Sequence, residues 1–136
     1  MINLATVLKL TRPLGVLDLE TTGLDPEVDR VWQIAITKHY PDKDPVKWTT
    51  LVHPQCKVTR SASEEFEKIN ARIEAEKPHP FMALADKLAS VLINMDFAGY
   101  NVYFDLKFMR AEMKRAKVDW DWEKFGANVI DAMKIW

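Results

Sequence analysis

The fold is decided by the stretch Leu14-Gly15-Val16-Leu17-Asp18-Leu19-Glu20-Thr21-Thr22-Gly23-Leu24-Asp25. Apolar residues followed by Thr, Gly and Asp are the pattern of a buried strand that runs into a turn. Side chains two residues apart on a strand point the same way, so Asp18 and Glu20 should converge. Two carboxylates held together in a low-dielectric place repel each other, and a bound divalent cation relieves the repulsion. The stretch therefore predicts a metal site, and the alternative is a solvated edge strand.

Length and composition set the class of protein. The chain has 136 residues, of which 48% are hydrophobic, and this predicts one domain over residues 1–136 with a packed core. A lone cysteine, Cys56, provides neither a disulfide framework nor a zinc quartet, which suits the reducing cytoplasm. The first ten residues have no charged leader, and Lys9 interrupts their apolar run, so we expect neither a signal peptide nor a membrane span.

Net charge argues against one class of function. A formal charge of −1 does not suit a protein that coats nucleic acid through its overall field. It leaves open an enzyme with a local basic rim.

Two further strands should follow the first. Residues Val31–Thr37 and Val46–Val52 are rich in β-branched and aromatic residues, and Pro41–Pro45 forms the turn between them. Three consecutive strands with short connections predict an antiparallel meander.

The second half of the chain alternates helices and strands. Ser61 and Glu64 have capping-box spacing before a short helix, and Pro78 and Pro80 open the next one. That helix has an apolar stripe formed by Phe81, Leu84, Leu88 and Val91. A strand over Asp96–Tyr100 and a helix over Tyr103–Ala116 should follow.

The helix over Tyr103–Ala116 has a basic stripe beside its apolar one. The stripe consists of Lys107, Arg110, Lys114 and Lys117. A solvated helix face explains such a stripe, and contact with substrate phosphates is the sharper alternative.

Asp105 is a third acid of interest, in the first turn of the same helix. There the exposed backbone amides and the helix dipole favour a negative group, so capping alone would explain it. Its position just beyond a strand that can lie beside the first strand favours a place in the same site as Asp18 and Glu20.

Two motifs now carry a family resemblance. Residues 18–25, together with Tyr100-Asn101-Val102-Tyr103-Phe104-Asp105-Leu106-Lys107-Phe108-Met109, resemble the first two motifs of the DEDD (DnaQ-like) 3'-to-5' exonucleases. That family includes ribonuclease T, oligoribonuclease and polymerase proofreading subunits. The resemblance implies a ribonuclease-H-like α/β fold, with a mixed five-stranded sheet of three antiparallel and two parallel strands flanked by helices. Val129–Met133 is similar to the family's last strand running into a helix.

The resemblance also implies roles for residues. Asp18 would bridge two Mg²⁺ or Mn²⁺ ions, Glu20 would bind one of them, and Asp105 would hold the second. The terminal nucleotide of a single-stranded 3' end would be contacted by Thr21, Thr22, Gly23, Leu24, Asn101 and Phe104, although Phe104 also suits the core. A homodimer or a polymerase partner is left open.

The third motif of the family has no counterpart in this chain. It supplies a His or Tyr base and a fourth acid, so the chain is expected to be C-terminally truncated, with weak or no activity. His39, His53 and His79 are interpreted as surface histidines rather than as that base. Ile130, Met133, Ile135 and Trp136 are typical of an amphipathic helix that has just begun.

Three hypotheses for function result. The first is a metal-dependent 3'-to-5' exonuclease domain that releases nucleoside monophosphates. The second is a non-catalytic module on a degenerate exonuclease fold that binds a nucleic-acid end or a polymerase, against which the clustered acids argue. The third is another ribonuclease-H-like nuclease or a transposase core, against which the Thr-Thr-Gly-Leu turn argues.

Overall fold

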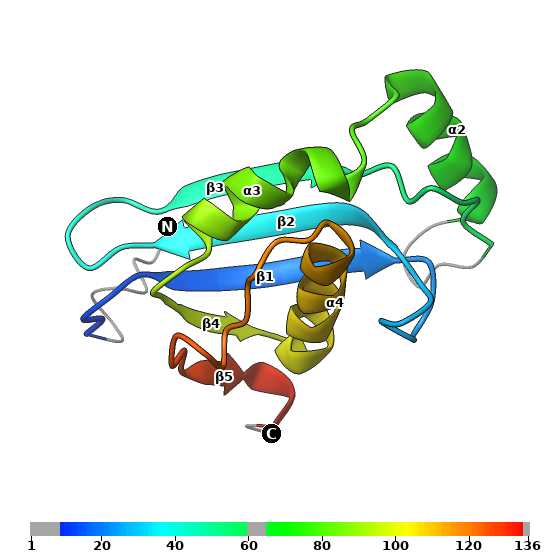
Figure 1. Ribbon diagram of the computed structural model, residues 1–136. Coiled ribbons are helices and arrows are strands. Elements are labelled where there is room, and N and C mark those ends of the chain that lie inside the picture. Colours follow the sequence, from blue (N-terminus) through cyan, green and yellow to red (C-terminus); the bar gives the residue numbers. More distant parts are fainter. Residues whose placement is uncertain (1–8, 60–64, 135–136) are drawn as a thin grey trace.

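The computed structural model describes residues 9–59 and 65–134 as a mixed sheet with helices on one face (Figure 1). The strands, β1 to β5, are Leu14–Thr21, Val31–His39, Val46–Leu51, Asp96–Gly99 and Val129–Asp131. They lie in the order β3-β2-β1-β4-β5. The first three pair antiparallel, and β4 and β5 pair parallel to their neighbours. The predicted five-stranded mixed sheet is confirmed.

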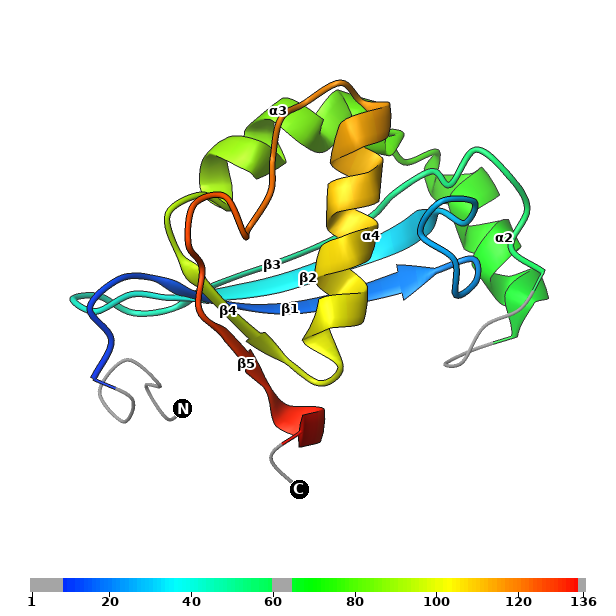
Figure 2. The ribbon, with the colours of Figure 1, turned by 60° about the horizontal axis from the view of Figure 1, so that its bottom comes forward.

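β1 is the central strand, and its side chains alternate between two environments. Leu17 and Leu19 belong to the main core, whereas Asp18 is exposed on the other face. β4 pairs with β1 only at residues 14–16, so among the described residues the strand is paired on one side alone where it carries Asp18 and Glu20. The alternative of a solvated edge strand is therefore confirmed in part: β1 is central, but its acids lie at an open edge, on a sheet face that no described helix covers (Figure 2).

Two helices cover the face toward which Leu17 and Leu19 point. They are α3, Phe81–Val91, and α4, Val102–Arg115, and Figure 2 shows both on the same side of the sheet. The predicted stripe of α3 is confirmed at Phe81 and Leu88, but Ala85 is buried as well. Leu84 is half-buried, and Val91, at the end of the helix, is 40% exposed. In α4 the predicted stripe is buried at Leu106, Met109 and Met113 and half-buried at Ala116.

Helix α2, Phe66–Glu76, lies beyond the end of the strands and has a small core of its own. Ile69 and Ile73 pack there with Trp32 and Val58. The predicted capping pair of Ser61 and Glu64 lies outside the described residues.

Most predicted element bounds agree with the observed ones to one or two residues, and β2 continues to His39 where Thr37 was predicted as its end. The helix predicted to begin after Ser61 begins at Phe66, with Glu65 as its N-cap.

The carboxyl end also differs from the prediction. There the structure has a short 3-10 helix, Ala132–Lys134, and the end of the predicted amphipathic helix, residues 135–136, lies outside the described part. Within the described part of the chain, no helix is long and apolar enough to cross a membrane.

The segment between α4 and β5 is held by aromatic side chains. Trp120 donates its indole N–H to the carbonyl of Leu92 at 2.8 Å, and its ring packs near Phe97, Trp122 and Phe125. Burying these rings stabilises an otherwise irregular connection and fixes where β5 joins the sheet.

Candidate functional site

Asp105 meets β1 at a break in the strand pairing. β4 pairs with β1 only at Leu14, Gly15 and Val16, so the edge of β1 is open beyond that point. The backbone N–H of Leu19 donates to Oδ1 of Asp105 at 3.0 Å, and Asp105 is only 4% exposed. The first turn of α4 thus supplies the hydrogen-bond acceptor that a longer β4 would have supplied.

The environment of Asp105 disfavours its negative charge. Burial raises the pKa of Asp105 to about 7, and the charges of Asp18 and Glu20 add to the rise, while the hydrogen bond from Leu19 opposes it. The three acids that the sequence singles out therefore interact electrostatically.

Whether these acids already form a metal site depends on how closely they are grouped. Among the described residues, no three His, Cys, Asp or Glu side chains are grouped closely enough to hold a metal ion. The donor chemistry does fit, because clustered carboxylate oxygens are the ligands that Mg²⁺ and Mn²⁺ prefer. The metal-binding roles of Asp18, Glu20 and Asp105 stay predictions.

The turn after β1 is closed by its own hydrogen bonds. Thr22 donates its backbone N–H to the carbonyl of Arg30, and its Oγ1 accepts the backbone N–H of Arg30. The Thr21 hydroxyl donates to the carbonyl of Gly23. Leu24, by contrast, is 78% exposed at the tip of the loop, so its apolar side chain is available for a ligand.

Gly23 is required for packing inside this loop. A Cβ atom at this position would lie 2.3 Å from Oδ2 of Asp29, which accepts the backbone N–H of Asp25. The predicted role, close passage of the backbone beside a nucleotide, stays untested.

Asn101 and Phe104 have different surroundings. Asn101 adopts a left-handed conformation (φ 55°) before α4, its side chain is exposed, and its backbone N–H donates to Asp131. Phe104 is half-buried against the main core, with its ring centroid 4.8 Å from that of Phe108. The core role of Phe104 that the sequence left open is thus observed, while its contact with a nucleotide stays a prediction.

Asp131 was not predicted to support the site. It is buried at the end of β5, and its Oδ1 accepts the backbone N–H groups of Asn101 and Met133. It therefore fixes the turn that begins α4 and carries Asp105. The sequence signal that could have indicated this role is an acid at the end of the last strand.

Glu112 is a second acid that the sequence analysis missed. It is 1% exposed on α4, and its carboxylate accepts hydrogen bonds from Arg30, Arg115 and the backbone N–H of Val31. Arg115 also donates to the carbonyls of Pro26 and Asp29. This group, Glu112 with Arg30 and Arg115, is here called the arginine clamp, and it fastens the loop after β1 to α4.

The residues of the basic stripe on α4 have different surroundings in the structure. Arg110 is paired with Asp121 and Glu123, and its guanidinium carbon lies 4.3 Å from the centre of the Trp122 ring. Lys107 and Lys114 are exposed and line a hollow together with Pro26 and Glu27 of the loop after β1. Arg110 therefore has a structural role, and the two lysines face solvent beside that loop.

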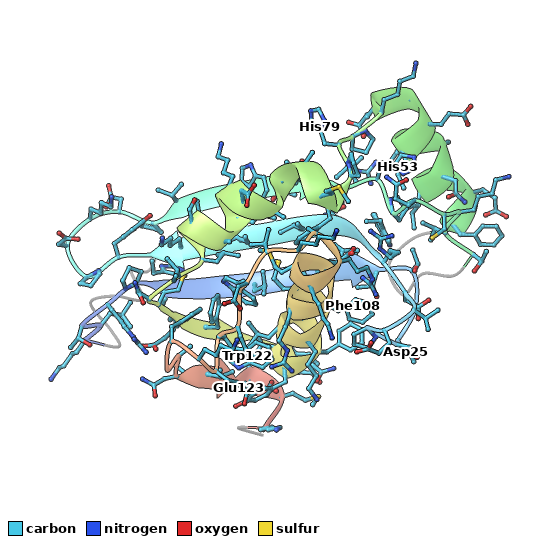
Figure 3. The ribbon with its side chains drawn as sticks, viewed as in Figure 1. Asp25, His53, His79, Phe108, Trp122 and Glu123 are labelled. Atoms are coloured by element: carbon cyan, nitrogen blue, oxygen red, sulfur yellow. The ribbon has the colours of Figure 1, made fainter. Side chains whose placement is uncertain are left out.

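The histidines do not form part of this site. His39, at the far end of the β1–β2 ladder, pairs with Leu14 and is 6% exposed, so its interpretation as a surface residue is wrong. Strand alternation places the side chain of His39 on the same face as Asp18, opposite the main core, beside its buried cross-strand partner Leu14. His53 and His79 lie beside α2, joined by a backbone hydrogen bond (Figure 3).

Comparison with known proteins agrees with the fold and the motifs. A family model described as an exonuclease, RNase_T, matches residues 16–135. DNA polymerase III PolC-type of Thermotoga maritima is 30% identical over 115 residues, covering 80% of this chain and 8% of that protein. The 3'-5' exonuclease DinG of Bacillus subtilis is 28% identical over 102 residues, covering 74% and 11%. The chain thus spans only about a tenth of the length of these relatives.

A solved structure has the same fold. It is the zinc-bound form of the E. coli exonuclease I complex with single-stranded DNA, with a TM-score of 0.64 and 20% identity. The match covers 93% of this chain and 29% of that chain.

The raised pKa of Asp105 predicts how stability depends on pH without metal. Between the ordinary value of 3.8 and about 7, the folded chain keeps a proton that the unfolded chain releases. The free energy of unfolding should therefore fall as the pH rises through this window. The Asp105→Asn variant keeps an acceptor for Leu19 but cannot ionise, so it should lose this dependence and exceed the wild type in stability at pH 8.

Urea unfolding in EDTA at several pH values between 4 and 8 measures this effect. Asp86→Asn, on the exposed side of α3, is the matched control and should keep the wild-type slope. A wild-type slope in the Asp105→Asn variant would contradict the assignment.

Removing the charge of Glu112 should destabilise the protein. Glu112→Gln leaves two arginines beside a neutral side chain, and loss of one partner of a buried ion pair costs on the order of 3 kcal/mol. Amide exchange in residues 22–30 should quicken as well. The control is Glu123→Gln, in an exposed pair, for which we expect a loss below about 1 kcal/mol. Equal losses from both variants would argue against the arginine clamp.

Proposed function

The chain belongs to the exonuclease family, and on this premise we propose that it is a 3'-to-5' exonuclease domain that hydrolyses nucleic-acid 3' ends to nucleoside monophosphates. One observation carries the proposal. The carboxylate of Asp105 is bound to the backbone of β1 between Asp18 and Glu20, and the charges of both acids raise its pKa. This repulsion does not stabilise the fold, whereas acids placed close to one another are what a cation site requires.

The proposed cofactor is a pair of Mg²⁺ or Mn²⁺ ions. Bound divalent ions stabilise the attacking and leaving oxygens of a displacement at phosphorus. We assign Asp18 as the ligand shared by both ions, Glu20 as a ligand of one, and Asp105 as a ligand of the second. The burial of Asp105 and its bond to Leu19 support this role, because they hold its carboxylate in one orientation before any cation arrives.

The terminal nucleotide is proposed to bind over the turn after β1. Thr21, Thr22 and Gly23 would face its sugar and phosphate, and the exposed Leu24 would pack against its base. Asn101, exposed at the start of α4, would reach the same nucleotide, while Phe104 would form the wall behind it.

The incoming strand is proposed to pass along the hollow between that turn and α4. Lys107 and Lys114 line this hollow together with Arg110 and Glu27, and the acids that neutralise Arg110 do not line it. The exposed ammonium groups of the two lysines suit the phosphates of a single strand.

None of the three histidines of the chain, which could supply a general base, lies near these acids, because His39 is at the far end of β2 and His53 and His79 lie beside α2 (Figure 3). Loss of a positioned base costs on the order of 10² to 10⁴ in rate, so we expect this chain to have weak or no activity by itself.

The substrate is proposed to be a single-stranded 3' end, because exonuclease I, which shares the fold, forms a complex with single-stranded DNA. Likeness to the PolC-type polymerase supports a polymerase partner, a homodimer is left open, and the cytoplasm is the proposed location.

Asp18→Asn should abolish whatever metal-dependent nuclease activity the wild type has. It should also weaken Mn²⁺ binding by about tenfold or more, because a shared anionic ligand is lost. Titration of Mn²⁺ in the presence of a nucleoside monophosphate measures binding even if turnover is negligible.

The control for this titration is Asp42→Asn, in the exposed turn between β2 and β3, which should bind Mn²⁺ as the wild type does. Failure of the wild type to bind Mn²⁺ would favour a non-catalytic module that binds nucleic-acid ends. Full nuclease activity in Asp18→Asn would refute the assignment of the acid.

Neutralising Lys107 and Lys114 together should flatten the salt dependence of binding to a single-stranded oligonucleotide. Each lost phosphate contact removes about 0.7 from the slope of log K against log salt, so the double glutamine variant should lose about 1.4. The control replaces Lys68 and Lys77, at α2, with glutamine. An unchanged slope in the α4 variant would leave these lysines as a solvated helix face.

A further inference from the structure

A groove lies on the opposite side of the sheet from Asp18. It has a volume of about 240 Å³ and separates α3 from the strands β2 and β3. Its position follows from the pleat, since Ile36 and Lys38 alternate with Ala35, the partner of Asp18 in the β1–β2 ladder. The groove is lined by Ile36, Lys38, Tyr40, Val46, Trp48, Leu84, Lys87, Leu88 and Val91.

The walls of this groove are apolar and open to solvent. Trp48 and Val91 are each 40% exposed, and Val46 is 55% exposed. Side chains of this size are normally covered when they gather in one place, and such a patch marks a binding surface.

The strand beside the groove is an edge of the sheet. β3 pairs with β2 on one side, and among the described residues no strand pairs with its other side. The side chains of Val46 and Trp48 point into the groove, so a segment added to β3 would point alternate side chains the same way.

The charge around the groove has one sign. Among the described residues, the charged side chains that line it are Lys38 and Lys87. Lys43 lies outside the lining and adds a third ammonium group, 4.1 Å from the centre of the Tyr40 ring. Asp42 and Asp44, in the neighbouring turn, are exposed and do not line it. This cationic groove stands out on a chain whose net charge is −1.

We propose that this groove binds an extended acidic peptide of a partner protein. The peptide adds to the β3 edge as a strand, inserts apolar side chains beside Trp48, and directs its carboxylates to Lys38 and Lys87. The open edge of β3 favours a peptide over single-stranded nucleic acid, which cannot pair with a strand edge. This inference goes beyond the exonuclease function and is independent of it.

The test uses the full chain and four labelled probes. Three are ten-residue peptides: alternating Phe and Glu, alternating Phe and Lys, and alternating Ser and Glu. The fourth is a ten-nucleotide oligo-dT. The Phe–Glu peptide should bind at least tenfold more tightly than the other two peptides and the oligonucleotide, and it should slow amide exchange in β3, the signature of strand addition.

Two variants localise the binding. Trp48→Thr keeps strand propensity but removes the ring, and Lys87→Glu reverses one charge at the rim. Each should weaken the Phe–Glu peptide by about tenfold or more. Lys68→Glu, which makes the same charge change on α2, should not.

The results that would contradict the peptide proposal can be told apart from one another. Equal binding of the Phe–Lys peptide, equal weakening by Lys68→Glu, or no change in β3 exchange would each overturn the proposal. Tighter binding of oligo-dT that depends on Trp48 would assign the groove to nucleic acid. A dimer in sedimentation that Trp48→Thr dissociates would assign it to a second copy of the chain, which also overturns the proposal.

Discussion

One hydrogen bond, from the amide of Leu19 to the carboxylate of Asp105, joins the two halves of the candidate site. It forms where the short strand β4 stops pairing with β1, so the first turn of α4 can take the place of a strand. Because β1 is also the centre of the sheet, any acid fixed to its backbone is fixed to the rigid part of the molecule. The position of Asp105 therefore depends on where β4 stops pairing, because that leaves the amide of Leu19 free to donate to its carboxylate.

Helix α4 contains two buried acids that resemble each other until their neighbours are considered. Asp105 and Glu112 are two turns apart, and each accepts a backbone N–H from the sheet, from Leu19 and Val31 respectively. Glu112 is flanked by two arginines, whereas the charged groups that act on Asp105 are two more acids. The first arrangement compensates the charge of Glu112 within the protein, and the second disfavours the negative charge of Asp105 and raises its pKa.

The sequence predicted the fold well because the signals were local. Each of these signals can be recognised within one short segment of sequence. They are the alternation along β1, the apolar stripes of α3 and α4, and the turn bounded by prolines. The residues whose surroundings the sequence did not predict depend on partners that are distant along the chain. Glu112 looks like any acid on a charged helix until Arg30 is brought to it, and His39 looks exposed until the end of β2 is covered. Arg110 belongs to a basic stripe in the sequence but is neutralised by acids that follow α4. The two motifs, although far apart in the sequence, did indicate the three acids whose charges act on one another in the structure.

The loop that follows β1 is closed at its base by the hydrogen bonds between Thr22 and Arg30. Such a closure fixes the register of β1 against β2 at the base of the loop, and Arg115 anchors the loop a second time through the carbonyls of Pro26 and Asp29. Leu24 projects from this doubly anchored loop into solvent, so a change of side chain there would alter what the tip touches while the acids on β1 and α4 keep their places.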